Sequence, residues 1–233
     1  MNASATDPAR VLVVVPARDE EALVGRCVGA LRRAARRVAV PVEVVVVADH
    51  CHDGTAEVAR AAGAHVVVLG PQPPAAGGVG AARAAGVAAG LARLGVAGTW
   101  IASTDADSLV PHCWLGHQLE HAGAGADLVL GVVELPTAAG VDPNAGWRRR
   151  YADGIDGTTH RHVHGANLGL RATTYLAAGG FPALSAHEDA RLAESVAGLR
   201  GARVVSTVGC PVLTSDRRTG RAPAGVAHDL RTA

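Results

Sequence analysis

The chain has 233 residues, of which 48% are hydrophobic and 3% aromatic, and its formal net charge is +1 at pH 7. This length fits one large α/β domain with a core built from Val, Leu and Ala. The near-neutral charge excludes the basic excess of a nucleic-acid-binding protein, so we expect no nucleic-acid partner. All 22 basic residues are arginines, which excludes Schiff-base chemistry and a Walker A phosphate loop, because both need a lysine.

The cysteines and the N-terminus bear on the cellular compartment. Cys27, Cys51, Cys113 and Cys210 form no CxxC pair, so we interpret them as free thiols in a reducing, cytoplasmic setting. The stretch 1–10 lacks the apolar core of a signal peptide, and the longest apolar runs are too short to span a bilayer. We therefore expect a soluble cytoplasmic protein without a transmembrane segment, for which contact with a membrane surface stays open.

The first half of the chain alternates short β-branched runs with helical periodicity. Buried strands are predicted over 11–16, 42–49, 65–70 and 99–104. Helices are predicted between them over 19–37, 53–63 and 80–95. The Pro/Gly-rich stretch 71–78 is predicted to be a mobile loop. This alternation predicts a doubly wound, parallel α/β sheet.

The second half is less regular. Helices are predicted over 111–122 and 187–201, and strands over 127–135, 202–207 and 210–215. The stretch 164–172 is predicted to be an extended segment that enters a short helix, whereas 136–162 has no clear periodicity. The tail from residue 216 is basic and rich in turn residues. Neither an internal repeat nor a domain linker is evident.

Three acids follow predicted strands at the edge of the sheet where α/β proteins bind ligands. They are Asp19, Asp49 and Asp105. Asp105 and Asp107 stand two residues apart, and like charges this close repel unless a cation lies between them. One interpretation is a divalent metal site; the other is a solvated turn whose aspartate caps a helix that begins at Pro111.

Several motifs resemble those of family 2 glycosyltransferases, in the same order. They are VVVPARDEE, VVVVADHCHDGT, GVGAARAAG, STDADS and HGANLGLRA…GGF…HEDARLAESV, which run from about residue 11 to 221. The resemblance implies a single GT-A type domain over 1–233, with a Rossmann-like, mostly parallel sheet flanked by helices. It also implies a nucleotide-binding half at about 11–110, an acceptor-binding half at about 111–221 and a tail at 222–233.

The resemblance implies donor-binding roles for residues after the first two strands. Pro16, Ala17 and Asp19 would line the nucleotide pocket, and Asp49 would accept a hydrogen bond from the base. The family usually has two acids at the second position, whereas this chain has Ala48 before Asp49. The base, uracil or guanine, is therefore left open, and the donor partner is expected to be a UDP- or GDP-sugar.

The resemblance also implies a metal-bound diphosphate. Asp105 and Asp107 would hold Mg²⁺ or Mn²⁺ against it, since hard cations prefer oxygen ligands and the cation neutralises the departing diphosphate. Arg83 would lie near the same diphosphate as a permanently charged donor. The alternative for Arg83 is a solvent-facing position on its helix.

The Glu-Asp pair of the last motif matches the catalytic region of the family. Asp189 would take the proton from the acceptor hydroxyl, giving inversion at the anomeric carbon, and Glu188 would shape the site. The alternative is that both acids only stabilise the start of their helix. Small residues would allow close approach beneath the donor sugar. These residues are Gly165, Ala166 and Asn167.

Two further groups depart from the family pattern. The arginines of the tail segment are good partners for phosphate, so we hypothesise that the tail covers the diphosphate or grips an anionic acceptor; a disordered basic end is the alternative. These arginines are Arg217, Arg218 and Arg221. Histidines also cluster over 50–52, 112–121 and 160–164. The first group lacks the paired four-ligand pattern of structural zinc. We interpret the second group as surface residues and the third as a partly exposed polar edge near the acceptor.

The sequence thus predicts a metal-dependent, inverting glycosyltransferase that moves a sugar from a nucleotide-sugar to an unidentified hydroxyl acceptor. A nucleotidylyltransferase is the first alternative, but the stretch after the first strand is acidic and not glycine-rich. A binding module that has lost turnover is the second alternative.

Overall fold

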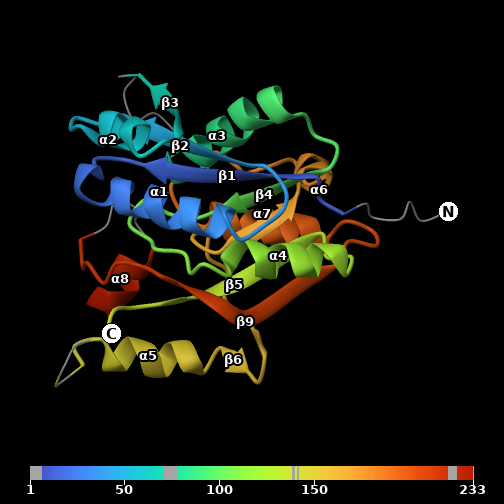
Figure 1. Cartoon of the computed structure of the whole chain (residues 1–233). Helices are drawn as coiled ribbons and strands as arrows, with labels where there is room; N and C mark the ends of the chain where they lie inside the picture. Colours follow the sequence, from blue (N-terminus) through green and yellow to red (C-terminus); the bar gives the residue numbers. More distant parts are fainter. Residues whose placement is uncertain (1–6, 71–77, 138–139, 141, 220–224, 233) are drawn as a thin grey trace.

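The computed structural model describes residues 7–70, 78–137, 140, 142–219 and 225–232, and Figure 1 shows the arrangement. A seven-stranded sheet with the order β3-β2-β1-β4-β8-β5-β9 forms the centre. Its strands are β1 (Arg10–Ala17), β2 (Val42–Asp49), β3 (His65–Leu69), β4 (Thr99–Ser103), β5 (Leu128–Glu134), β8 (Leu168–Arg171) and β9 (Val204–Leu213). A separate two-stranded pair consists of β6 (Ile155–Asp156) and β7 (Thr159–His160).

The described helices flank this sheet. They are α1 (Glu21–Ala35), α2 (Thr55–Ala61), α3 (Gly78–Leu94), α4 (Trp114–Gly123), α5 (Ala145–Ala152), α6 (Ala172–Ala177), α7 (Glu188–Ala197) and α8 (Val226–Arg231). Neighbouring strands are parallel except at β8, which runs antiparallel to both β4 and β5. The predicted α/β class with a mostly parallel sheet is therefore confirmed.

The core divides between the two faces of the sheet, because side chains alternate along a strand. On β1, Val11, Val13 and Val15 belong to a cluster with α1, α2 and α4. Leu12 and Val14 point the other way, into a cluster with α3, α6 and α7. This two-sided burial explains why the run is continuously apolar rather than alternating.

The second half differs from its prediction in several places. The two short strands predicted over 202–215 form the single strand β9, whose pairing with β5 shifts register between Gly131 and Val133. Such an irregularity interrupts the apolar pattern, which is why the strand reads as two pieces. The stretch 136–162 contains α5 and the β6–β7 pair, and the tail contains α8. Residues 71–77 of the predicted mobile loop lie outside the described residues.

The prediction of four free thiols is wrong for one pair. Cys113 and Cys210 form a disulfide that joins the start of α4 to β9, whereas Cys27 and Cys51 are free. The partners are 97 residues apart in the sequence, and only the tertiary fold brings them together. A disulfide does not support the predicted reducing compartment, so the cytoplasmic location stays a prediction. Within the described residues, we find no helix long and apolar enough to cross a membrane.

Candidate active site

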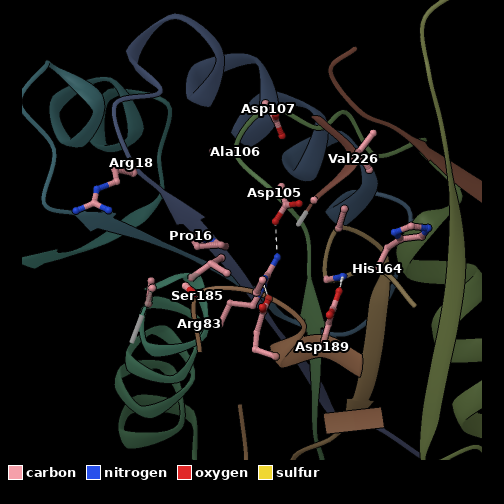
Figure 2. Close-up of a pocket in the computed structure, with 18 of the residues that line it drawn as sticks. Pro16, Arg18, Arg83, Asp105, Ala106, Asp107, His164, Ser185, Asp189 and Val226 are labelled. Carbon is pink, nitrogen blue, oxygen red and sulfur yellow. Dashed lines mark hydrogen bonds and ion pairs between the residues drawn. The ribbon is translucent and has the colours of Figure 1, made fainter. Parts of the chain in front are cut away.

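A cavity of about 1050 Å³ opens at the carboxyl ends of β1, β2 and β4 (Figure 2). Its walls come from both halves of the chain. They include Pro16, Ala17, Glu20, Asp49, His50, Arg83, Asp105, Ala106, Asp107, His164, Gly165, Ala166, Glu188, Asp189 and Arg217. Most of the residues predicted for the site therefore meet around one space, although they are far apart in the sequence.

The chain turns sharply where β1 and β2 reach the cavity. Asp19 and His50 have positive φ values of 49° and 52°, an uncommon backbone conformation outside glycine. Asp49 lines the cavity and its Oδ1 lies 2.6 Å from Nδ1 of His50. Asp19 is not among the lining residues; its Oδ1 accepts a hydrogen bond of 2.6 Å from the backbone N–H of His52. Asp19 thus holds the two loops together beside the cavity.

Two arginines pair with the aspartates after β4. Arg83 Nη2 lies 2.5 Å from Asp105 Oδ1, and Arg217 Nη2 lies 3.0 Å from Asp107 Oδ2. Arg217 also binds Glu20 Oε1 at 2.6 Å, so the segment after β9 reaches across to the loop after β1. Arg83 is therefore buried in the site, not solvent-facing on its helix as the alternative interpretation had it.

The electrostatics of Asp107 favour a cation at this position. Burial, followed by the nearby carboxylate of Asp105, raises the pKa of Asp107 to about 6, although Arg217 opposes the rise. Asp105 is more open to solvent, with 35% of its side chain exposed. Two carboxylates that keep oxygens near an open cavity fit Mg²⁺ or Mn²⁺, which take few protein ligands and complete their shell with phosphate and water. The donor set of Asp105 and Asp107 therefore suits a divalent metal.

Asp189 lies in the first turn of α7 and faces the same cavity (Figure 2). Its Oδ2 accepts a hydrogen bond of 2.7 Å from the backbone N–H of Gly165, and its Oδ1 accepts one of 2.8 Å from Ala190. The residue before α7, His187, has a φ of 61°, which turns the chain so that α7 starts at the cavity wall. The carboxylate is thus held by two backbone donors while its side chain borders open space.

His164, which we expected on a partly exposed polar edge near the acceptor, lines the cavity. Its Nε2 lies 3.0 Å from the hydroxyl of Tyr151, whose ring stacks on Trp147 and His162 with centroids 4.4 and 3.9 Å apart. Burial, together with the neighbouring His162 and His160, lowers the pKa of His164 to about 4, although Asp189 opposes the fall. The alternation of His160, His162 and His164 was the available signal, and the structure does bring their rings together.

Asn167 and Arg218, like Asp19, are predicted site residues that do not line the cavity. Asn167 is buried behind the wall, where its Oδ1 accepts from Trp114 Nε1 at 2.8 Å and its Nδ2 donates to the carbonyl of Val132. Arg218 donates to the carbonyls of Leu230 and Pro143, so it supports α8 rather than the cavity. Arg221 lies outside the described residues.

A second group of metal-capable side chains lies beside the cavity. Among the described residues, ligand atoms of Asp19, Cys51 and Asp53 lie within 4.8 Å of one another. Asp53 already accepts hydrogen bonds from the backbone N–H groups of Thr55 and Glu21, which explains its position without a metal.

Fold and site together define a class of protein: a GT-A type α/β domain whose acidic cavity lies at the carboxyl edge of a mostly parallel sheet. The chain belongs to the family described as glycosyltransferase-like family 2, whose model matches residues 8–179. The resemblance predicted from the motifs is therefore confirmed at the level of the family. No curated protein sequence matches the chain.

Solved structures share the fold. TarS residues 1–349 from S. aureus, in complex with UDP-GlcNAc, is 14% identical with a TM-score of 0.67, covering 93% of this chain and 61% of that one. The mannosyltransferase PcManGT from Pyrobaculum calidifontis, in complex with GDP-Man and Mn²⁺, is 18% identical with a TM-score of 0.61, covering 91% and 58%.

A third structure is glucosyl-3-phosphoglycerate synthase from Mycobacterium tuberculosis, in complex with Mn²⁺, UDP and phosphoglyceric acid. It is 18% identical with a TM-score of 0.56, covering 91% of this chain and 73% of that one. At these identities the likeness shows the fold alone. The chain also spans less than two thirds of the length of the first two structures.

Proposed function

We propose that this protein transfers a glycosyl group from a nucleoside diphosphate sugar to a hydroxyl group of an acceptor, with inversion at the anomeric carbon. The observation that carries the proposal is one cavity bordered by both an acidic pair, Asp105 and Asp107, and a separate carboxylate, Asp189. The acidic pair suits a metal-bound diphosphate, and Asp189 suits an acceptor hydroxyl group. Family membership supports the same reaction.

The nucleotide would lie against the ends of β1 and β2. Pro16 and Ala17 supply an apolar wall, and Asp49 offers a carboxylate to hydrogen-bond donors of the base. Structural relatives have been solved with UDP-GlcNAc and with GDP-Man, which supports a UDP- or GDP-sugar as the donor. Arg217, beside Asp107, would add positive charge where the diphosphate binds.

Asp105 and Asp107 would hold Mg²⁺ or Mn²⁺. Two structural relatives were solved with Mn²⁺, which supports a divalent metal here as well. The metal, when bound, would neutralise the charge that develops on the departing diphosphate. Asp105 and Asp107 both lie just after the end of β4. A metal held by them would therefore have a fixed position relative to that strand.

Asp189 would act as the general base. It would accept the proton of the acceptor hydroxyl while that oxygen forms a bond to the anomeric carbon and the bond from that carbon to the diphosphate oxygen breaks. One displacement from the opposite side gives inversion. The backbone N–H groups of Gly165 and Ala190 orient the carboxylate, and Gly165 and Ala166 leave room for the donor sugar.

The test is release of the nucleoside diphosphate from a panel of UDP- and GDP-sugars, with Mn²⁺ and with EDTA. We expect slow hydrolysis of one donor even without acceptor, and its loss in EDTA and in Asp105→Asn. Binding of a donor with no release under any condition would instead support a binding module without turnover. Release of pyrophosphate from a nucleoside triphosphate and a sugar phosphate would support a nucleotidylyltransferase.

A further inference from the structure

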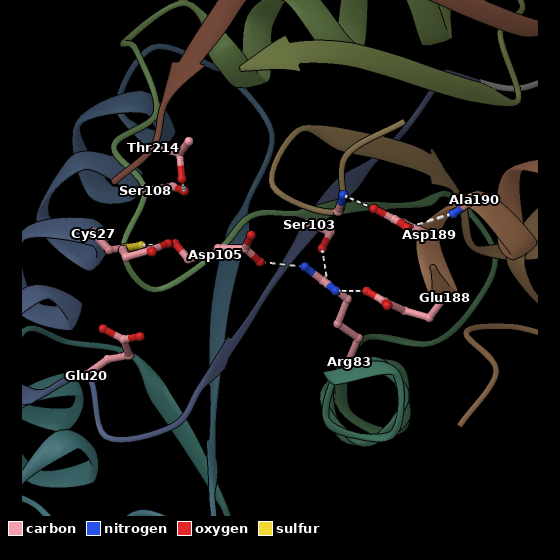
Figure 3. Close-up of polar contacts among 12 residues, drawn as sticks. Glu20, Cys27, Arg83, Ser103, Asp105, Ser108, Glu188, Asp189, Ala190 and Thr214 are labelled. Carbon is pink, nitrogen blue, oxygen red and sulfur yellow. Dashed lines mark hydrogen bonds and ion pairs between the residues drawn. The ribbon is translucent and has the colours of Figure 1, made fainter. Parts of the chain in front are cut away.

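Arg83 contacts Asp105 of the acidic pair and Glu188, the neighbour of Asp189 in the sequence. It projects from α3 and is 3% exposed, so the guanidinium is almost fully removed from solvent. Its Nη2 binds Asp105 at 2.5 Å and its Nη1 binds Glu188, the residue directly before Asp189 (Figure 3). Its Nε donates to Ser103 Oγ at 3.1 Å, at the end of β4. One side chain thus joins the metal-binding loop to the first residue of α7.

A second route leads from Arg83 to Asp189. A side chain at Gly165 would overlap the guanidinium of Arg83, so the backbone of Gly165 lies directly against it. The N–H of the same glycine donates to Asp189 Oδ2. Arg83 therefore fixes both the helix that carries Asp189 and the backbone donor that orients its carboxylate.

The guanidinium is held from its remaining side as well. Its Cζ lies 5.8 Å from the centroid of the Phe181 ring, a cation–π distance. Close packing of α3 on α7 maintains this arrangement, because a Cβ at Gly80 would lie 3.0 Å from Glu188 Cβ and would overlap the carbonyl of Pro182. Arg83 has no freedom to turn toward a ligand without giving up these contacts.

The chemistry of arginine explains the choice of side chain. Burial opposes the charge of Arg83, but Asp105 and Glu188 outweigh it and raise the pKa of the guanidinium. A guanidinium presents donors in a fixed planar fork, so two acids bound to it keep a defined geometry. Lysine carries a single charged nitrogen on a flexible chain and cannot hold Ser103, Asp105 and Glu188 at once.

We propose that Arg83 is a positioning residue. It holds the proton acceptor Asp189 at a fixed position relative to the metal ligand Asp105, and it does not bind the diphosphate itself. The roles of Asp189 as proton acceptor and Asp105 as metal ligand rest on the proposed function. The physical content of the proposal, a rigid link from the end of β4 to the start of α7, can be measured without any turnover.

The first experiment measures amide hydrogen exchange in Arg83→Lys. We expect the Gly165 N–H, which Asp189 holds, to exchange at least about tenfold faster, while amides of the β1–β2 pairing keep their wild-type rates. The matched control is Arg93→Lys on the same helix, whose ion pair with Glu43 lies at the surface, and it should change neither set. Unchanged exchange at Gly165 in folded Arg83→Lys would overturn the inference.

The second experiment separates positioning from diphosphate binding. We expect Arg83→Lys to bind the nucleoside diphosphate with Mn²⁺ within about threefold of wild type and to lose about 100-fold in kcat. A loss of more than tenfold in affinity with kcat unchanged would instead make Arg83 a diphosphate clamp and overturn the inference. If the wild type itself neither binds nor turns over any donor, the proposed function fails. The hydrogen-exchange result alone then tests whether Arg83 links the end of β4 to the start of α7.

A double-mutant cycle tests the route through Glu188. Glu188→Gln keeps the shape of the side chain but removes its charge, and we expect it to accelerate exchange at Gly165 in the same way. The double variant Arg83→Lys with Glu188→Gln should add little to either single change, because both act on one link. Fully additive effects would mean that the two residues act independently, which contradicts the proposed connection.

Discussion

Asp189 and Asp107 are both carboxylates in the same cavity, but their surroundings suit them for different tasks. Burial and the neighbouring Asp105 disfavour the charge of Asp107, so a cation bound beside it would stabilise the charged form. Asp189 is half-buried and accepts hydrogen bonds from two backbone N–H groups, while its side chain borders the cavity. A carboxylate that is oriented but still accessible is what proton transfer requires.

Asp189→Asn separates catalysis from donor binding. The amide keeps one oxygen that can accept from Gly165, so we expect the fold and the affinity for the donor to stay close to wild type. Turnover should fall by about 10²- to 10⁴-fold, because the amide cannot take the acceptor proton. Calorimetry with the nucleoside diphosphate checks the affinity, and a transfer or hydrolysis assay checks the turnover. Undiminished transfer would mean that another group is the base.

The buried ring of His164 predicts a pH dependence of stability. Its pKa is lowered from 6.5 to about 4 in the folded protein, so the unfolded chain binds more protons between these values. The free energy of unfolding should therefore fall as the pH drops from about 7 to about 4, by about 3 kcal/mol from this residue. Urea unfolding at pH 7.5 and pH 5 measures the slope.

The matched variant for this effect is His164→Gln, which can still accept a hydrogen bond from Tyr151 but does not titrate. We expect a shallower dependence on pH than in the wild type, with the difference confined to the acid side of pH 7. Identical slopes for the two proteins would show that His164 does not remain neutral in the fold. His160, whose pKa burial also lowers, is present in both proteins, so the difference between the two slopes reports mainly on His164.

At the scale of elements, the packing of α3 on α7 and on the segment directly before it depends on a glycine. A Cβ at Gly80 would overlap the backbone carbonyl of Pro182, which cannot move aside as a flexible side chain could. We expect Gly80→Ala to lower the free energy of unfolding by about 1–3 kcal/mol. A Cβ at Gly116 in α4 would instead point into open space, with no neighbouring atom within 4 Å outside its own helix backbone. Gly116→Ala should therefore stabilise by about 0.5–1 kcal/mol, since helical glycine costs conformational entropy.

Chemical unfolding of both variants checks this prediction. Equal effects at the two positions would mean that the helices are not in close contact at Gly80. The substitution at Gly80 should also affect the proposed active site, because Gly80 lies against the Cβ of Glu188. A shift of α7 should lower turnover in Gly80→Ala even at temperatures where the variant is fully folded.

Elements of the first half could be predicted from the sequence because their signals are local. Runs such as that of β1 are buried on both faces, so they read as continuous apolar segments between helical periods. β9 could not be predicted as one strand, since its register shift interrupts the pattern. The β6 and β7 strands have two residues each, too few for any period to appear.

The site was predictable in its acids and less so in its contacts. Asp105 and Asp189 stand in motifs, so their place on the cavity could be expected from the resemblance. The link from Asp105 through Arg83 to Glu188 depends on how α3 packs on α7, and no spacing along the chain predicts it. Asn167 stands in a motif too, but tertiary packing turns it toward Trp114, away from the cavity.

At the scale of the whole molecule, the disulfide joins distant parts of the chain. Without reductant, we expect an alkylating reagent to modify Cys51 in the folded protein and Cys27 only after unfolding, because burial raises the pKa of the Cys27 thiol far above its usual value. Cys113 and Cys210 should react only after reduction, which should lower stability by about 2–4 kcal/mol. Peptide mass mapping checks this, and labelling of Cys113 in the native, unreduced protein would contradict it.

The cavity draws its walls from both halves of the chain, so its ligand should stabilise the whole molecule. Strands before and after residue 110 share one sheet, and the segment after β9 returns to Glu20 and Asp107 through Arg217. A nucleoside diphosphate bound with metal would contact both halves. Its binding should therefore raise the unfolding temperature of a single cooperative transition.

The most direct test of the account is thermal unfolding with UDP or GDP, each with and without Mn²⁺, in the wild type and in Asp105→Asn with Asp107→Asn. A ligand at about one hundred times its dissociation constant adds about 2.7 kcal/mol of stability, which is easily measured. We predict a shift with one nucleotide that requires Mn²⁺ and disappears in the double variant. A shift that persists in the double variant, or no shift with either nucleotide, would contradict a metal-bound diphosphate at Asp105 and Asp107.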